Sequence, residues 1–151
     1  MVNIAGNGFE IITVGLIGGF LAQMIKMLSY TAFYRKVNFK LLVQTGGMPS
    51  SHSSSVTAMA TSTGLISGFS SVDFAIAIGI ALIVMYDAAG VRQAAGKMAG
   101  ILNRITEDFY KHHPEHIPDR LRELLGHTPF EVFIGALFGI GLAIMLHDYL
   151  A

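Results

Sequence analysis

The chain has 151 residues, of which 52% are hydrophobic and only 13% are charged, and its formal net charge is zero. This composition is unusual for a soluble domain and favours a single integral-membrane domain over residues 1–151. The basic residues form no stripe, which excludes a nucleic-acid partner, and the lack of cysteine excludes disulfides, thiolate metal sites and thiol nucleophiles.

Four stretches are long enough to cross a bilayer as helices, which takes about 20 residues. They cover about residues 10–33, 50–69, 72 to beyond 92, and 129–150. The second stretch is rich in serine, threonine, alanine and glycine, so we expect it inside the bundle with its hydroxyls bonding across helices. The predicted fold is therefore an all-α membrane bundle of about four transmembrane helices.

Lysine and arginine mark two of the three connections between these stretches. They lie between the first and second and between the third and fourth, whereas the 68–73 connection and both termini have none. The positive-inside rule then places both basic loops in the cytoplasm and both termini outside. We therefore expect residues 50–53, 87–92 and 127–131 to meet at the cytoplasmic boundary.

The most informative motif is Gly-Gly-Met-Pro-Ser-Ser-His-Ser at residues 46–53. It combines a turn, a proline suited to the first turn of a helix, hydroxyls and an imidazole. The first N–H groups of a helix have no acceptors within it, so this position suits a phosphate. Ser50, Ser51 and His52 are the candidate ligands. The alternative is a capped helix start with a surface histidine.

Ionisable residues in or beside the predicted spans are further candidates, because they are costly at membrane depth. Lys26 lies in the cytoplasmic half of the first span, where it either contacts a ligand or extends to the headgroups. Asp87 and Arg92 are five residues apart, which is a poor spacing for a pair within one helix. They could still form a structural ion pair, but we expect Arg92 to reach into the site.

His127 and Glu131 are four residues apart, on one face of a helix that begins by Thr128. A carboxylate bonded to one ring nitrogen makes the other nitrogen a better nucleophile or base. The alternative is a helix cap with a local hydrogen bond. The histidine-rich stretch at residues 112–116 could bind zinc or copper, but we interpret it as a solvated loop and expect no metal site and no cofactor.

Three motifs in order resemble the divergent PAP2 family (DUF212, or YuiD-like), small membrane proteins related to acid phosphatases and vanadium-dependent haloperoxidases. They are residues 46–53, Tyr-Asp-Ala-Ala-Gly-Val-Arg at 86–92 and Leu-Leu-Gly-His-Thr-Pro-Phe-Glu-Val at 124–132, with Leu102 and Asn103 between the last two. The resemblance covers most of the chain and implies a PAP2-like core. The wider superfamily consists of all-helical, metal-independent phosphatases, many acting on lipid phosphates and diphosphates.

The resemblance implies roles for several residues and also shows departures from the superfamily pattern. His127 matches the histidine that becomes phosphorylated, and Glu131 stands in place of an aspartate. Ser51 replaces a glycine, Leu121 stands where an arginine is expected, and the arginine–proline pair expected after Lys26 is absent. Phosphate coordination is therefore rearranged or lost.

We therefore expect a membrane phosphatase that hydrolyses a phosphomonoester or diphosphate of a lipid through a phosphohistidine. His127 attacks, Glu131 orients it and His52 protonates the leaving group; the predicted phosphate ligands are Lys26, Ser50, Ser51 and Arg92, with Asp87 in support. The expected partners are membrane lipids and a phospholipid or isoprenoid-phosphate-like substrate. The alternatives are a non-catalytic membrane protein that binds or passes a phosphorylated lipid or anion, and a structural helix-packing protein.

The family is common in bacteria, so we expect the bacterial inner membrane, with the active site near its cytoplasmic face. Four spans make a small enclosure, which a homodimer would complete.

Overall fold

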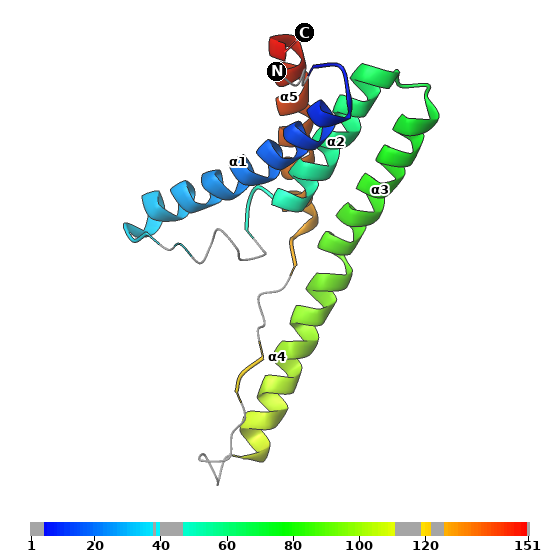
Figure 1. Ribbon diagram of the computed structural model, residues 1–151. Helices are drawn as coiled ribbons and strands as arrows, with labels where there is room; N and C mark the ends of the chain where they lie inside the picture. The colour runs from blue at the N-terminus through cyan, green and yellow to red at the C-terminus, as the bar shows by residue number, and fades with distance from the viewer. Residues whose placement is uncertain (1–4, 38, 40–46, 111–118, 122–125, 151) are drawn as a thin grey trace.

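The computed structural model describes residues 5–37, 39, 47–110, 119–121 and 126–150, except for the side chain of Arg92. Its long elements are all helices, as Figure 1 shows: α1 (Gly8–Tyr34), α2 (Ser51–Ser67), α3 (Val72–Ala89), α4 (Val91–Phe109) and α5 (Pro129–Leu150). The predicted all-α bundle is confirmed, and each predicted stretch lies within a few residues of a helix. The third stretch forms two helices, because the chain breaks at Gly90 between α3 and α4.

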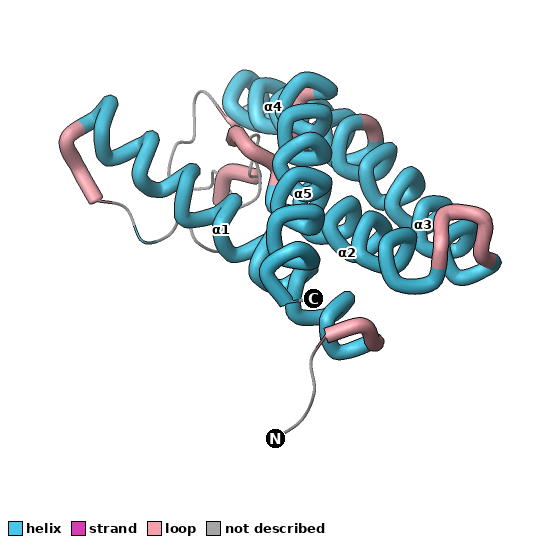
Figure 2. The backbone as a smooth tube through the Cα atoms, turned by 90° about the horizontal axis from the view of Figure 1, so that it is seen from above, coloured by secondary structure: helices cyan, strands magenta, loops and turns pink. Residues whose placement is uncertain are grey.

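Helix α2 is the centre of the bundle. It contacts α1, α3 and α5, whereas α4 packs only against α3 within the described part of the chain. Figure 2 shows α2 among these three helices, and Figure 1 shows α4 continuing from α3 and extending beyond the bundle. The polar, small-residue composition of α2 is therefore explained by its enclosure, as the sequence predicted.

The contact between α2 and α5 depends on glycines of α5 and hydroxyls of α2. Ser54 Oγ donates a hydrogen bond to the carbonyl of Gly135 at 3.0 Å, and Thr57 Oγ1 donates one to the carbonyl of Ala136 at 3.1 Å. A Cβ atom on Gly135 would lie 2.6 Å from the Ser50 carbonyl oxygen, and one on Gly139 would overlap the Ser54 carbonyl. The glycines let the two backbones approach closely, so the predicted bonding across helices is confirmed.

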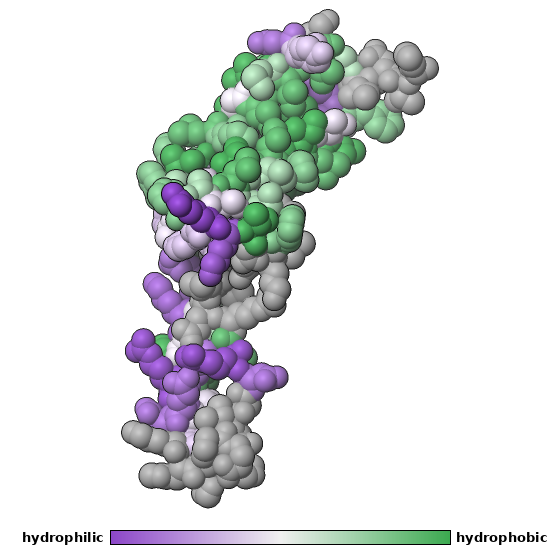
Figure 3. All heavy atoms as spheres, turned by 90° about the vertical axis from the view of Figure 1, so that its left-hand side faces the viewer, coloured by the Kyte–Doolittle hydropathy of each residue, from purple (hydrophilic) through white to green (hydrophobic). Residues whose placement is uncertain are grey.

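Three helical segments are long and apolar enough to cross a membrane: Gly8–Tyr34, Val72–Phe109 and Pro129–Leu150. Helix α2 does not reach this length, because it has 17 residues. About four spans were expected. The structure has three such segments, and the remaining helix, α2, is shorter and is enclosed by its neighbours. Figure 3 shows hydrophobic side chains over the bundle and hydrophilic ones toward its lower end, where α4 protrudes.

The beginning of α1 and the end of α5 lie together. His147 Nδ1 is 2.7 Å from Glu10 Oε1, although the two residues are 137 positions apart. His127 lies at the other end of α5, just before its first residue. The two chain ends and the predicted site are therefore at opposite ends of the bundle (Figure 1).

Candidate active site

The start of α2 is fixed by Ser50, which is its N-cap. The Ser50 hydroxyl accepts hydrogen bonds from the backbone N–H and the hydroxyl of Ser53, at 3.4 and 3.1 Å. The Ser50 N–H donates to the carbonyl of Glu131 at 3.3 Å, and the residue is fully buried. Pro49 precedes this cap, so it does not occupy the first helical turn as the sequence suggested. Ser50 ties the start of α2 to the start of α5.

The start of α5 forms a capping box. The Thr128 hydroxyl accepts a hydrogen bond from the Glu131 N–H at 3.3 Å, and the Glu131 carboxylate accepts one from the Thr128 N–H at 3.2 Å. Pro129 occupies the first helical position, where its missing N–H costs nothing. Local sequence therefore places the Glu131 side chain back over the residues that precede the helix.

The same Glu131 carboxylate holds His127. His127 Nδ1 lies 3.1 Å from Glu131 Oε2, and the His127 backbone N–H donates to the carbonyl of Ala88 in α3 at 2.9 Å. Both interpretations of this pair, the helix cap and the oriented histidine, are thus present in one arrangement. With Nδ1 as the donor to the carboxylate, the lone pair of Nε2 is available for attack.

The His127 ring is buried, with 1% of its surface exposed. Its Nε2 atom has no well-formed hydrogen bond to a described residue, although the backbone of Gly47 is close enough to the ring to oppose the lowering of its pKa. Burial lowers the pKa of His127 below its ordinary value of 6.5, and the charge of Lys26 acts in the same direction, whereas the hydrogen bond to the Glu131 carboxylate opposes them. The lowered pKa favours the neutral imidazole, which is the form that can act as a nucleophile.

His52 and Lys26 lie beside this dyad. The ring centroids of His52 and His127 are 6.3 Å apart with an interplanar angle of 67°. Lys26 is buried to 6% exposure, and a Cβ atom on Gly47 would lie 3.4 Å from its Cδ atom, so its stem packs along that turn. Its charge interacts with Glu131 and His127. Residues from four separate parts of the sequence therefore meet at one end of the bundle.

The remaining predicted residues are placed less centrally or not at all. Ser51 is half-buried in the first turn of α2, and Asp87 is half-buried immediately before Ala88. The backbone of Arg92 lies in the first turn of α4, but its side chain is outside the described part. The histidine-rich stretch at residues 112–116 is also outside it. The roles predicted for these residues stay predictions.

Sequence reasoning missed a second buried ionisable cluster, at the opposite end of the bundle. Glu10 is fully buried, pairs with His147, and accepts hydrogen bonds from the Gly6 N–H at 2.7 Å and the Ser62 hydroxyl at 3.4 Å. A glutamate at the edge of the first span was itself the signal, because a carboxylate there needs a partner. The partner was not identifiable from spacing, since it comes from the other end of the chain.

The arrangement around His127 suits group transfer to and from an anion. It combines a buried imidazole oriented by a carboxylate, a second imidazole whose ring centroid is 6.3 Å away, and a buried lysine. An oriented imidazole can attack phosphorus, and the ammonium charge can neutralise phosphoryl oxygens.

Comparisons with known proteins identify the family of this chain. The family model described as the divergent PAP2 family matches residues 8–142. The chain is 42% identical over 135 residues to the uncharacterized membrane protein YuiD of Bacillus subtilis (strain 168), a match that covers 83% of this chain and 85% of that protein. No solved structure matches the chain significantly. The family match includes α1 to α4, the His127 dyad and most of α5, and the chain belongs to the divergent PAP2 family.

Proposed function

We propose that this protein is a membrane phosphatase that hydrolyses a phosphomonoester or diphosphate of a lipid through a phosphohistidine at His127. The observation that carries the proposal is the buried His127 ring, bonded to Glu131 through Nδ1 and 6.3 Å from the ring of His52. We further propose that this site lies at the cytoplasmic face of a bacterial inner membrane, because the basic connections lie at this end of the chain's helices.

The reaction has two steps. In the first, Nε2 of His127 attacks phosphorus, the bond from phosphorus to the lipid oxygen breaks, and protonated His52 gives its proton to that oxygen. In the second, His52 takes a proton from water, whose oxygen attacks phosphorus, and the bond to Nε2 breaks to release inorganic phosphate. Glu131 holds the His127 ring and stabilises its positive charge in the intermediate, and Lys26 neutralises phosphoryl oxygens.

We expect the purified protein in bilayer nanodiscs to release phosphate from some members of a panel of lipid phosphates and diphosphates. Vanadate is expected to inhibit at concentrations about a hundredfold or more below the KM, because its trigonal-bipyramidal adduct resembles the transition state. Chelators are expected to leave the rate unchanged, since histidine supplies the nucleophile. A protein that only binds or passes phosphorylated lipids would bind the panel without releasing phosphate, and that result would overturn the proposal.

Glu131→Gln is expected to lower kcat by about a hundredfold or more, because it removes the carboxylate. The amide keeps the size of the side chain but removes the charge that orients His127 and that interacts with Lys26. Glu131→Asp keeps the charge on a shorter side chain and is the matched control, expected to retain more activity than Glu131→Gln. Phosphate release is measured alongside thermal unfolding, so that loss of fold is separated from loss of rate. Equal rates for wild type and a folded Glu131→Gln variant would contradict the orienting role.

A further inference from the structure

A groove runs along the interface of α1 and α2 and begins at His52. Its volume is about 400 Å³, which is within the range of small-molecule sites. Its walls are formed by eight residues of the two helices: Gly15, Leu16, Gly19, Phe20, Gln23, Ser51, His52 and Ser55. His52 lines the groove, and its ring centroid is 6.3 Å from that of His127, so the groove ends beside the candidate active site.

The groove is polar at one end and apolar at the other. Helices α1 and α2 run in opposite directions, since Gly19 lies against Ser51 and Ser55 while Gly15 lies against Met59. Gln23 and His52 are therefore at the end nearest His127, and Leu16 is deeper in the membrane-spanning segment. The Oε1 atom of Gln23 is buried and has no hydrogen-bond partner among the described residues, which costs free energy until a donor binds there.

The apolar part of the groove opens toward the lipid. Leu16 and Phe20 are 68% and 62% exposed, and they belong to α1, a helix long and apolar enough to span the membrane. Gly19 has no side chain that could fill the space between α2 and the side chains of Leu16 and Phe20. A Cβ atom at this position would meet Ser55 Cβ at 3.5 Å, an ordinary contact, so a side chain can be built here and would occupy the groove.

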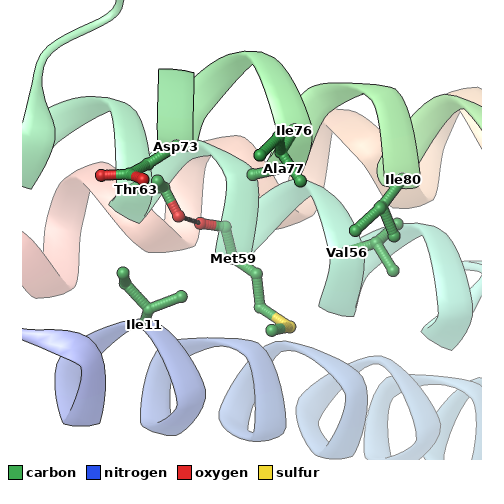
Figure 4. Close-up of a pocket in the computed structure, with 8 residues that line it drawn as sticks. All are labelled: Ile11, Val56, Met59, Thr63, Asp73, Ile76, Ala77 and Ile80. Atoms are coloured by element: carbon green, nitrogen blue, oxygen red, sulfur yellow. Dashed lines mark hydrogen bonds between the residues drawn. The ribbon is translucent and has the colours of Figure 1, made fainter. Parts of the chain in front are cut away.

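A single flexible side chain closes the deep end. The side chain of Met59 covers Gly15, where even a Cβ atom would overlap it. Met59 also lines a second pocket, of about 270 Å³, between α1, α2 and α3. Figure 4 shows Met59 in this pocket between Ile11 of α1 and the α3 residues Ile76 and Ala77. Met59 therefore lies between two neighbouring cavities.

We propose that the groove between α1 and α2 holds one linear hydrocarbon chain of the phosphorylated lipid, with the phosphate at His127 and the chain end at Met59. The phosphate position rests on the proposed function, whereas the chain position rests on the groove itself. An amphipathic ligand fits because the polar and apolar ends of the groove match its own. Met59 then limits the chain length, and Gly19 keeps the path open.

The first test compares linear alkyl monophosphates from ethyl to hexadecyl phosphate. Gly19→Leu is expected to lower the ratio of kcat/KM for octyl over ethyl phosphate about tenfold, as when about two methylene groups lose their burial. Met59→Ala is expected to raise the ratio for hexadecyl over octyl phosphate, because it joins the groove to the second pocket. Gly141→Leu is the matched control: it makes the same change in α5, where a Cβ atom meets nothing within 4 Å, and both of its ratios should equal the wild-type values. An unchanged ratio in both groove variants would overturn the proposal.

The second test does not depend on catalysis. Octyl phosphate with a diazirine at the chain end is photolysed on the protein in nanodiscs, and the labelled residues are mapped by mass spectrometry. We expect labelling around Gly15, Leu16 and Met59 that excess octyl phosphate displaces and that Gly19→Leu reduces. If the wild type releases no phosphate but shows this labelling, the phosphatase proposal fails and the groove proposal stands. Labelling spread evenly over the lipid-facing helices would overturn the groove proposal.

Discussion

His127→Ala is expected to lower the rate of phosphate release from any lipid substrate by at least about a thousandfold, because it removes the nucleophile. No other described side chain combines the burial of His127 with an imidazole nitrogen held by a carboxylate, so we expect no substitute nucleophile. The measurement is phosphate release in nanodiscs, together with acid-labile labelling of the protein by radioactive phosphate during turnover. Wild type is expected to be labelled, and His127→Ala is not.

His52→Ala is the matched control for this result, because it removes the other imidazole. With 4-nitrophenyl phosphate, whose leaving group needs no proton, His52→Ala should still form the phosphohistidine, whereas His127→Ala should not. Circular dichroism on heating shows whether both variants stay folded. A folded His127→Ala variant that releases phosphate at the wild-type rate would contradict the mechanism, as would labelling that persists in it.

Gly139→Ala is expected to lower the free energy of unfolding by about 1–3 kcal/mol, the usual cost of overpacking a close contact. A Cβ atom at Gly139 would overlap the Ser54 carbonyl oxygen and the Thr57 hydroxyl. Backbone cannot move aside as the end of a long side chain can, so α5 must shift away from α2. That shift would weaken the hydrogen bond from the Ser54 hydroxyl to the Gly135 carbonyl, which is now 3.0 Å long.

Gly141→Ala is the control for this prediction. It lies two residues further along α5, where a Cβ atom would meet nothing within 4 Å, so its stability should be unchanged or slightly higher. Thermal unfolding in the same detergent, followed by circular dichroism, compares the two variants. Equal melting temperatures would show that the close approach of α2 and α5 contributes little to stability. Because Glu131 lies in the first turn of α5, we also expect Gly139→Ala to reduce phosphate release.

The approximate bounds of α1, α2 and α5 and the residue types of the site followed from local sequence, whereas the break at Gly90 between α3 and α4 did not. The predicted fourth span, at about residues 129–150, coincides with α5 because Thr128, Pro129 and Glu131 encode a capping box. The same local rule places the Glu131 carboxylate over His127. The position of α2 at the centre was also predictable, since its hydroxyls and small side chains need partners from other helices.

Other features depended on contacts between distant segments. The contact between Glu10 and His147 joins the start of α1 to the end of α5, and no local motif predicts that either residue pairs with the other. Gln23 belongs to no motif that the sequence analysis singled out, yet its side chain lines the groove that begins at His52. Such features arise from how closely whole helices pack, which hydrophobic pattern alone does not specify.

The sequence by itself determined which segments are helices in a membrane, because a bilayer admits only long apolar stretches whose backbone is satisfied internally. It also determined the chemistry available, through the motifs around His52 and His127. Only the tertiary structure decided that these two rings lie 6.3 Å apart and that a groove leads from His52 between α1 and α2. The physical reason is close packing: glycines such as Gly135 and Gly139 set the separation of the helices, and that separation fixes which distant side chains meet.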